Sequence, residues 1–126
     1  MIRREEALEY HAGERPGKIE VRPLKPCLTA REMSLAYLPG ASWASEAIAA
    51  DPDAAFRYTS RGNLLGVITN GSAVPGLGNA GPLAAKPMQE GLALLFKRLA
   101  DIDVFDLEIN VEDPDLFVET VLRLEP

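Results

Sequence analysis

The segment with the most recognisable chemistry is the glycine-rich stretch that follows the apolar run 64–69. Gly76, Gly78 and Gly81 have the spacing G-x-G-x-x-G, which in dinucleotide-binding proteins brings a backbone close to a pyrophosphate at a helix N-terminus. In that motif the first glycine follows its strand almost directly, whereas here residues 70–75 intervene. The spacing therefore leaves two interpretations. One is a dinucleotide site, and the other is a tight turn whose backbone passes close to another element or a ligand.

Two further side chains could donate a proton or hold a charge. Tyr37 precedes the turn Leu38-Pro-Gly40, which would place its phenol at a loop tip, where it could act as a general acid. Packing in the core is the alternative. Lys86 lies beside the glycine loop, just before a predicted helix, and could hold a carboxylate there. The alternative is an ordinary exposed lysine.

The other polar candidates predict structure rather than chemistry. The single histidine, His11, precedes a Gly/Pro-rich break and is expected at an exposed helix end, and the lone Cys27 is expected to be a small buried or half-buried side chain. Four acidic residues follow one another closely, namely Asp101, Asp103, Asp106 and Glu108. Because Asp106 and Glu108 alternate with apolar residues, we expect them on the solvated face of a strand, and we predict no metal site.

Composition limits the class of protein. A chain of 126 residues with one cysteine fits a single domain in a reducing compartment. The net charge of −6 argues against a nucleic-acid-binding surface, which needs clustered lysine and arginine. No apolar run approaches the roughly 20 residues of a membrane span, and the charged N-terminus is not a secretory signal. We therefore expect a cytoplasmic protein that binds neither nucleic acid nor membrane.

The first half of the chain predicts short elements. Residues 4–11 favour a helix, and 19–21 a short strand. Thr29-Ala-Arg-Glu32 has the spacing of a capping box, which predicts a helix through Leu35. Ser42 is a candidate N-cap for a helix over 43–50 that ends at Asp51-Pro52.

The second half has clearer periodicity. The continuous apolar run 64–69 predicts a strand covered on both faces. Helical spacing over 87–100 places Pro87 in a first turn, and alternation over 105–111 predicts a half-buried strand. Asp113-Pro114 then caps a final helix. Strand, helix, strand and helix in this order predict an α/β fold with a parallel sheet.

From Leu8 to Pro126 the chain resembles the N-terminal domain of a bacterial malic enzyme. The motifs that carry the resemblance keep their order and spacing, and they include Leu8-Glu-Tyr-His11, Gly17-Lys-Ile-Glu-Val21, Ser34-Leu-Ala-Tyr37, Asn70-Gly71, Gly76-Leu-Gly-Asn79, Lys86-Pro87, Glu90-Gly91 and Asp101-Ile-Asp-Val-Phe-Asp-Leu-Glu-Ile-Asn110. The resemblance implies a three-layer α/β/α fold with a mainly parallel sheet, preceded by a short helical and irregular N-terminal segment. It implies one domain over 1–126, with an arm over 1–28 and a core over 29–126.

This family oxidises malate to pyruvate and CO2 with NAD or NADP and Mg2+ or Mn2+. The resemblance implies that Tyr37 is the general acid that protonates the enolpyruvate carbon. It also implies that the cleft is lined by the loop residues Asn70, Gly76, Gly78 and Asn79 together with Lys86. The family's nucleotide and metal sites lie beyond Pro126, so we expect this chain alone to bind neither cofactor.

One departure from the family affects the chemistry directly. A lysine two residues past Glu90-Gly91 is the family's general base on the malate hydroxyl, and this chain has Leu92 at that position. Leucine has no ionisable group and cannot accept a proton. Met88, Leu95 and Leu99 lie on the same predicted apolar stripe as Leu92, so we expect Leu92 to be buried.

The residues and the resemblance together lead to one main hypothesis. The chain is the substrate-side domain of a malic enzyme, cut from a longer protein, inactive alone because of Leu92, homodimeric, and able to meet malate or pyruvate in its full-length context. One alternative is a non-catalytic structural or subunit-pairing relative. Another is a free-standing dinucleotide-binding domain that uses Gly76 to Gly81.

Overall fold

The computed structural model describes residues 2–125 and divides them into two compact units. The first unit comprises the chain up to Ile19 together with the chain from Leu65 onward, and the second comprises Glu20–Leu64. Pro126, the last residue of the resemblance, lies outside the described residues, and the division into a 1–28 arm and a 29–126 core stays a prediction.

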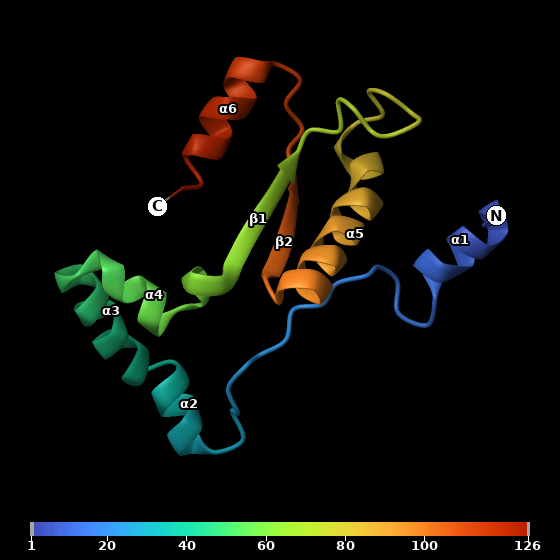
Figure 1. The fold of residues 1–126 in the computed structure, drawn as a ribbon. Coiled ribbons are helices and arrows are strands. Elements are labelled where there is room, and N and C mark those ends of the chain that lie inside the picture. Colours follow the sequence, from blue (N-terminus) through green and yellow to red (C-terminus); the bar gives the residue numbers. More distant parts are fainter. Residues whose placement is uncertain (1, 126) are drawn as a thin grey trace. The chain divides into compact units, whose positions relative to one another are not determined.

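The first unit contains a small parallel sheet. Strands β1 (Leu64–Thr69) and β2 (Asp103–Glu108) lie side by side and run in the same direction, joined by helix α5 (Pro82–Ala100), which packs against β2 (Figure 1). The backbone N–H of Ile109 donates to the carbonyl of Thr69 at 2.8 Å, so the pairing continues one residue past the end of β2. The α/β class and the parallel strand order are therefore confirmed.

The burial of β1 differs from the prediction. Its first half is exposed, with Leu64 44% and Leu65 39% accessible, and only its second half is partly covered. The prediction of a strand covered on both faces is wrong for the first three residues, because within this two-stranded sheet α5 packs chiefly on the neighbouring β2.

Helix α5 begins five residues earlier than its apolar pattern predicted. Gly81, with φ +84°, precedes Pro82 at the first helical position, so Pro87 lies inside the helix rather than in its first turn. Pro87 has no backbone N–H, and the carbonyl of Leu83 therefore lacks its usual intrahelical donor. The helix ends at Ala100, and its C-cap Asp101 adopts the left-handed conformation and donates its N–H to the carbonyl of Lys97.

The terminal helices of this unit agree with the sequence. Helix α1 covers Arg4–Ala12, and α6 covers Pro114–Leu122, with the carboxylate of Asp113 accepting from the N–H of Leu116 at 2.8 Å. The short strand predicted over 19–21 is absent from the described residues. Immediately before this stretch, the N–H of Lys18 donates to the side chain of Glu90 on α5.

The second unit is helical in the described residues. It consists of α2 (Ala30–Ala36), α3 (Gly40–Ala50), the 3-10 turn η1 (Pro52–Ala54), α4 (Ala55–Tyr58) and the 3-10 turn η2 (Ser60–Asn63). The capping box of α2 is confirmed, because Thr29 Oγ1 accepts from the N–H of Glu32 at 3.2 Å and Glu32 Oε2 accepts from the N–H of Thr29 at 2.9 Å.

Helix α3 starts before the predicted cap. Ser42 lies inside the helix and donates its N–H to the carbonyl of Pro39, so it caps nothing. The helix begins at Gly40, where a Cβ atom would lie 2.3 Å from the carbonyl oxygen of Leu35. Only glycine fits this close approach, which explains why the turn between α2 and α3 ends at this residue.

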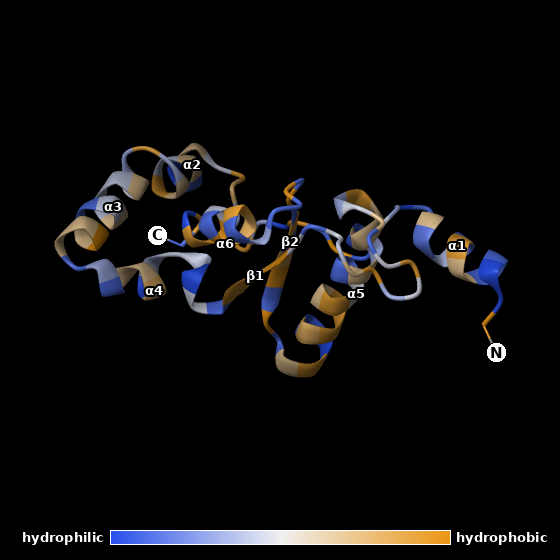
Figure 2. Cartoon of the chain, turned by 90° about the horizontal axis from the view of Figure 1, so that it is seen from above, coloured by the Kyte–Doolittle hydropathy of each residue, from blue (hydrophilic) through white to orange (hydrophobic). Residues whose placement is uncertain are grey.

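The packed core is small. Four hydrophobic side chains are buried among the described residues: Ala54, Val74, Ala85 and Ala93. Hydrophobic residues nevertheless occur along both strands and along α5 (Figure 2). The exposed ones on α5 are Met88 (51%), Leu92 (40%), Leu95 (50%) and Leu99 (79%). The expectation that Leu92 is buried is therefore wrong, because α5 covers β2 with a different face. Within residues 2–125 no helix has the length and apolarity that a membrane span requires.

Candidate functional site

The glycine loop is a compact turn held by its own backbone. Gly76, Gly78 and Gly81 all have positive φ angles, at 78°, 70° and 84°. Val74 and Gly78 exchange backbone hydrogen bonds of 2.8 and 2.9 Å, which fold the loop tip back on itself. At the base of the loop, the N–H of Gly81 donates to the carbonyl of Gly71 at 3.2 Å.

This geometry argues against a dinucleotide fingerprint. In such a motif the helix starts within the glycine pattern, so that its free N–H groups meet the pyrophosphate. Here α5 starts only after Gly81, at the end of the pattern. A Cβ atom on Gly71 would lie 2.0 Å from the carbonyl oxygen of Gly81, so the two ends of the loop touch. The tight-turn interpretation fits, and the loop does not match the cradle that a dinucleotide needs.

Asn70 is used by the fold itself. Its Nδ2 donates to the carbonyl of Val111 at 3.0 Å, and its Oδ1 accepts from the N–H of Ser72 at 3.1 Å. The side chain therefore ties the end of β1 to the chain beyond β2 and shapes the start of the loop. Asn79, by contrast, is exposed near the loop's far end. The role of both residues in a substrate cleft stays a prediction.

A small hollow joins the loop to α5. It has a volume of about 40 Å3 and is lined by Val74 and Pro75 from the loop and by Met88 and Gln89 from the helix, among others. Such a volume holds roughly one or two water molecules. Leu92 follows Met88 by one helical turn on the same side of α5, so the glycine loop lies beside the stripe that contains position 92.

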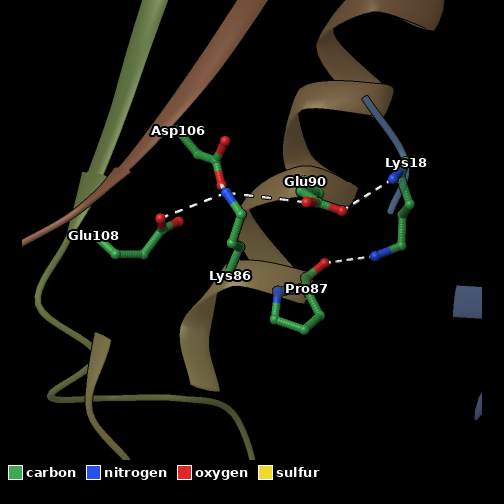
Figure 3. A network of polar contacts seen from close by, with 6 residues as sticks. All are labelled: Lys18, Lys86, Pro87, Glu90, Asp106 and Glu108. Atoms are coloured by element: carbon green, nitrogen blue, oxygen red, sulfur yellow. Dashed lines mark hydrogen bonds and ion pairs between the residues drawn. The ribbon is translucent and has the colours of Figure 1, made fainter. Parts of the chain in front are cut away.

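A charged cluster lies on another side of α5 (Figure 3). Lys86 Nζ donates to Asp106 Oδ2 at 2.5 Å and to Glu108 Oε2 at 3.5 Å, and it lies 4.0 Å from Glu90 Oε1. The side chains of Asp106, Glu108 and Glu90 are only 4%, 13% and 13% exposed. The predicted solvated face of β2 is therefore wrong, because Lys86 of α5 covers the two acidic residues.

The contacts within the cluster shift the pKa values of its members in different directions. The hydrogen bond to Asp106 raises the pKa of Lys86, and the negative charges of Asp106 and Glu108 add to this effect against a partial desolvation. Burial would raise the pKa of Asp106, but hydrogen bonds from Lys86 and Glu108 outweigh it and hold that pKa below its ordinary value. Burial raises the pKa of Glu108, and the neighbouring Asp106 raises it further. Lys86 is therefore held as a cation by its acidic partners, although its own side chain is 42% exposed.

Glu90 connects this cluster to the N-terminal segment. Its Oε2 accepts from the backbone N–H of Lys18 at 2.9 Å, while Lys18 Nζ donates to the carbonyl of Pro87 at 2.7 Å (Figure 3). Gly17 has φ +88°, and a Cβ atom there would lie 3.2 Å from Glu90 Oε2. The backbone at Gly17 is thus shaped to approach this carboxylate closely.

Tyr37 lies in the second unit, at the turn between α2 and α3. It is the C-cap of α2 and is 73% exposed, ahead of the cis Leu38-Pro39 bond. Its backbone forms hydrogen bonds with both helices. The N–H of Tyr37 donates to the carbonyl of Met33, and the carbonyl of Tyr37 accepts from the N–H of Ala41 at 2.7 Å. The loop-tip placement is borne out, and the alternative of core packing is wrong within this chain. Its role as a general acid stays a prediction.

Two other candidates take no part in either cluster. His11 lies in the last turn of α1 and is half-buried, with Nδ1 2.7 Å from the carbonyl oxygen of Ala7 and its ring edge-on to Tyr10. Cys27 is exposed, contrary to the expected buried or half-buried side chain. Cys27 lies in the irregular stretch that precedes α2.

The described residues do not fit the family's cofactors. Across residues 2–125 no three His, Cys, Asp or Glu side chains are grouped so that they could hold a metal ion. In the charged cluster an ammonium group already occupies the space between Asp106 and Glu108. The glycine loop leads into the N-terminus of α5 only at its last glycine, whereas in a dinucleotide fingerprint the helix starts within the glycine pattern.

Sequence reasoning missed the charged cluster. Alternation along 105–111 and the position of Lys86 beside the loop do not by themselves connect Lys86 to Asp106 and Glu108. The available signal was the pair Lys86 and Glu90, spaced i and i+4 on a helix that leads directly into the strand with Asp106 and Glu108. A crossover helix must pack on the strand that follows it, so charges of opposite sign on the two elements can meet.

Comparison with known proteins gives one consistent result. Residues 16–121 match the family model "Malic enzyme, N-terminal domain". The chain is 53% identical over 122 residues to an NADP-dependent malic enzyme of Rhizobium meliloti and 48% identical over 122 residues to an NAD-dependent malic enzyme of the same organism. Each match covers 97% of this chain and 16% of the relative, so the chain spans about a sixth of their length.

A solved structure gives the same assignment. The crystal structure of the malic enzyme from Pyrococcus horikoshii superposes with a TM-score of 0.89 at 45% identity, over 94% of this chain and 28% of that one. The matched family model covers most of the described residues, including the glycine loop, α5 and the charged cluster. The chain therefore belongs to the malic enzyme family and corresponds to its N-terminal domain.

Proposed function

We propose that this chain is the substrate-side part of an enzyme that converts malate to pyruvate and CO2, and that the chain does not perform this reaction unaided. Membership of the family supports the reaction class, since its relatives are named NADP- and NAD-dependent malic enzymes. The poor fit of residues 2–125 to a metal or a dinucleotide supports the second half of the proposal. In this proposal NAD or NADP and Mg2+ or Mn2+ are held outside this chain.

The observation that carries the proposal is Leu92 at the position of the family's general base. Leu92 lies on an accessible side of α5, 40% exposed, one helical turn after Met88, which lines the hollow beside the glycine loop. A side chain at this place is available to a ligand, but a leucine can accept no proton. Tyr37 remains as the general acid, and the loop with Asn70, Gly76, Gly78 and Asn79 borders the substrate.

Lys86 cannot replace the missing base. A general base must be deprotonated near neutral pH before it can accept a proton. The carboxylates of Asp106 and Glu108 act in the opposite direction and raise the pKa of Lys86. Lys86 also lies six residues before Leu92, on a different side of α5. Its contribution to the cleft is a fixed positive charge at the start of the helix.

The test is a pair of chimeras. The wild-type chain and its Leu92→Lys variant are each fused to the remaining part of an NADP-dependent malic enzyme, and malate-dependent NADPH formation is measured with Mn2+. General-base assistance contributes about 10²–10⁴-fold to rate, so the lysine chimera should exceed the leucine chimera by a factor in that range. Equal rates in two folded chimeras would mean that position 92 does not face the substrate.

Two further chimeras make the test specific. Tyr37→Phe in the lysine chimera removes the phenolic proton and should abolish most of the gain. Leu95→Lys places a lysine on the same stripe one turn away and should give no comparable gain, because a base must lie within hydrogen-bond reach of the hydroxyl. Equal gains from Leu92→Lys and Leu95→Lys would contradict the residue assignment.

A second candidate function is subunit pairing without catalysis, in the cytoplasm and as a homodimer. The exposed stripe of α5, with Met88, Leu92, Leu95 and Leu99, favours it. Soluble monomers rarely leave a continuous apolar face uncovered. The two functions separate in the chimera experiment, because a pairing module should gain no malate oxidation from Leu92→Lys.

A further inference from the structure

The charged cluster between α5 and β2 holds more acidic than basic groups. Around the ammonium group of Lys86 lie the carboxyls of Asp106 and Glu108 from β2 and of Glu90 from α5. A second cation beside them is Lys18 of the N-terminal segment, whose backbone N–H donates to Glu90 and whose Nζ donates to the carbonyl of Pro87. Strand β1 contributes no titratable side chain.

The contacts of Lys86 are unequal. Its Nζ lies 2.5 Å from Asp106 Oδ2 but 3.5 Å from Glu108 Oε2, so its charge chiefly compensates Asp106. Glu90 accepts a hydrogen bond from the backbone N–H of Lys18. Glu108 is left with the weakest partner although its side chain is only 13% exposed.

One carboxylate oxygen of Glu108 also lacks a hydrogen-bond donor. Its Oε1 is buried and accepts no hydrogen bond from any described group. A buried acceptor without a donor is destabilising, and a buried charge without a partner is more so. A proton on Glu108 removes both costs, because the neutral carboxyl is itself a donor and Asp106 is an acceptor beside it.

We propose that Asp106 and Glu108 share one proton beside Lys86, so that the contact between α5 and β2 is a proton-dependent anchor. The proton is carried by Glu108, which donates a hydrogen bond to the ionised Asp106, while Lys86 bonds the same aspartate from the helix side. When Glu108 loses this proton, two like charges face each other at a single ammonium group, and the anchor weakens. The proposal concerns the fold of this chain and holds whether or not position 92 faces a substrate.

The sign of the pH effect follows from linkage. The pKa of Glu108 is raised in the folded chain, first by burial and then by Asp106. A carboxyl of this kind contributes stability that is fully present below its unfolded pKa, near 4.3, and is lost as pH rises through the folded value. Asp106 behaves in the opposite way, since its pKa is lowered and its contribution is lost as pH falls.

The first experiment follows the carboxyl carbons of the 126-residue chain by 13C NMR between pH 3 and 8. We expect Glu108 to titrate above the ordinary glutamate value of about 4.3, and we expect Asp106→Asn to move its midpoint downward. An ordinary or lower midpoint for Glu108 would overturn the proposal, and so would a midpoint that Asp106→Asn leaves unchanged.

A second experiment keeps the proposal testable if Asp106→Asn fails to fold. Glu108→Gln is a neutral isostere that cannot lose a proton, and exposed Glu112→Gln is its matched control. Urea midpoints are measured for each chain from pH 4 to 8. The wild type and Glu112→Gln should lose stability over this range by an amount that Glu108→Gln does not show. Parallel pH dependence in all three chains would refute proton sharing.

Discussion

Two sides of the same helix show opposite relations between polarity and burial. On one side of α5, Lys86 and Glu90 lie against β2 and the N-terminal segment, with the Glu90 side chain 13% exposed. On the other, Leu92 and Leu95 are 40% and 50% exposed. In an isolated amphipathic helix of a globular protein the charged side faces water and the apolar side is covered.

The difference indicates what each side does. Charges are buried only when they are paired, so the Lys86 side is an anchor that holds α5 in place within this chain. An apolar side that stays accessible marks a surface for something the described residues do not contain. Position 92, which we propose corresponds to the family's general base, lies on this second side.

A lysine placed on each side of α5 in turn tests whether only one side is packed. Ala93 is 2% exposed, whereas its neighbour Leu92 is 40% exposed. Ala93→Lys puts an unpaired charge and extra volume into the packed side and should lower the free energy of unfolding by about 2–4 kcal/mol. Leu92→Lys should change it by less than about 0.5 kcal/mol, as for other surface sites.

Urea denaturation followed by circular dichroism measures both variants. A loss of equal size in the two would mean that the Leu92 side is also packed in solution, and the distinction between an anchor and an open surface would then fail. The small cost expected for Leu92→Lys also matters for the chimeras, because a gain in malate oxidation would not be masked by unfolding.

Removing the cation should weaken the anchor itself. Lys86→Met keeps most of the side-chain length but leaves Asp106, only 4% exposed, without its donor. Leaving a buried polar group unsatisfied costs about 1–3 kcal/mol, and the free energy of unfolding at pH 7 should fall by an amount in that range. Part of the loss should return at pH 5, where the pair of carboxyls takes up a proton more readily.

Lys97→Met is the matched control on the same helix. Lys97 pairs with Asp101 and Asp103, whose side chains are 87% and 44% exposed. Ion pairs in water are screened and contribute little, so no measurable change is expected. If Lys97→Met proved as costly as Lys86→Met, burial of the acidic partners would not be what gives the cluster its strength.

How far the sequence predicts this fold depends on whether the signal is local. The capping box at Thr29, the Asp113 cap and the alternation of helix and strand are local patterns, and the structure confirms each of them. The start of α5 was misplaced because Pro87 can begin a helix as well as lie within one. Gly81-Pro82 carried the same type of signal five residues earlier.

The sides of the elements could not be assigned in the same way. Alternation along β2 put Asp106 and Glu108 in solvent, because acidic residues are normally exposed. What reversed this was a lysine 20 residues earlier, on a helix whose packing side is set by the sheet. The stripe through Leu92 predicts a core position because apolar residues are normally buried. Periodicity identifies a stripe, but only the tertiary contacts decide whether this chain covers it.

The smallest expected effect concerns association through the exposed stripe. If Leu92, Leu95 and Leu99 cover one another in a dimer, Leu95→Glu places a charge within the contact and removes part of its apolar area. Loss of roughly 1.4 kcal/mol of such burial corresponds to a tenfold weaker association, and we expect a decrease of at least about that size. Arg98→Gln alters the net charge by the same amount on another side of α5 and should leave association unchanged. Sedimentation equilibrium at micromolar concentrations measures all three chains. A wild-type chain that stays monomeric at high micromolar concentration would exclude this pairing, and the open side of α5 would then be left to a ligand or to a further part of the protein.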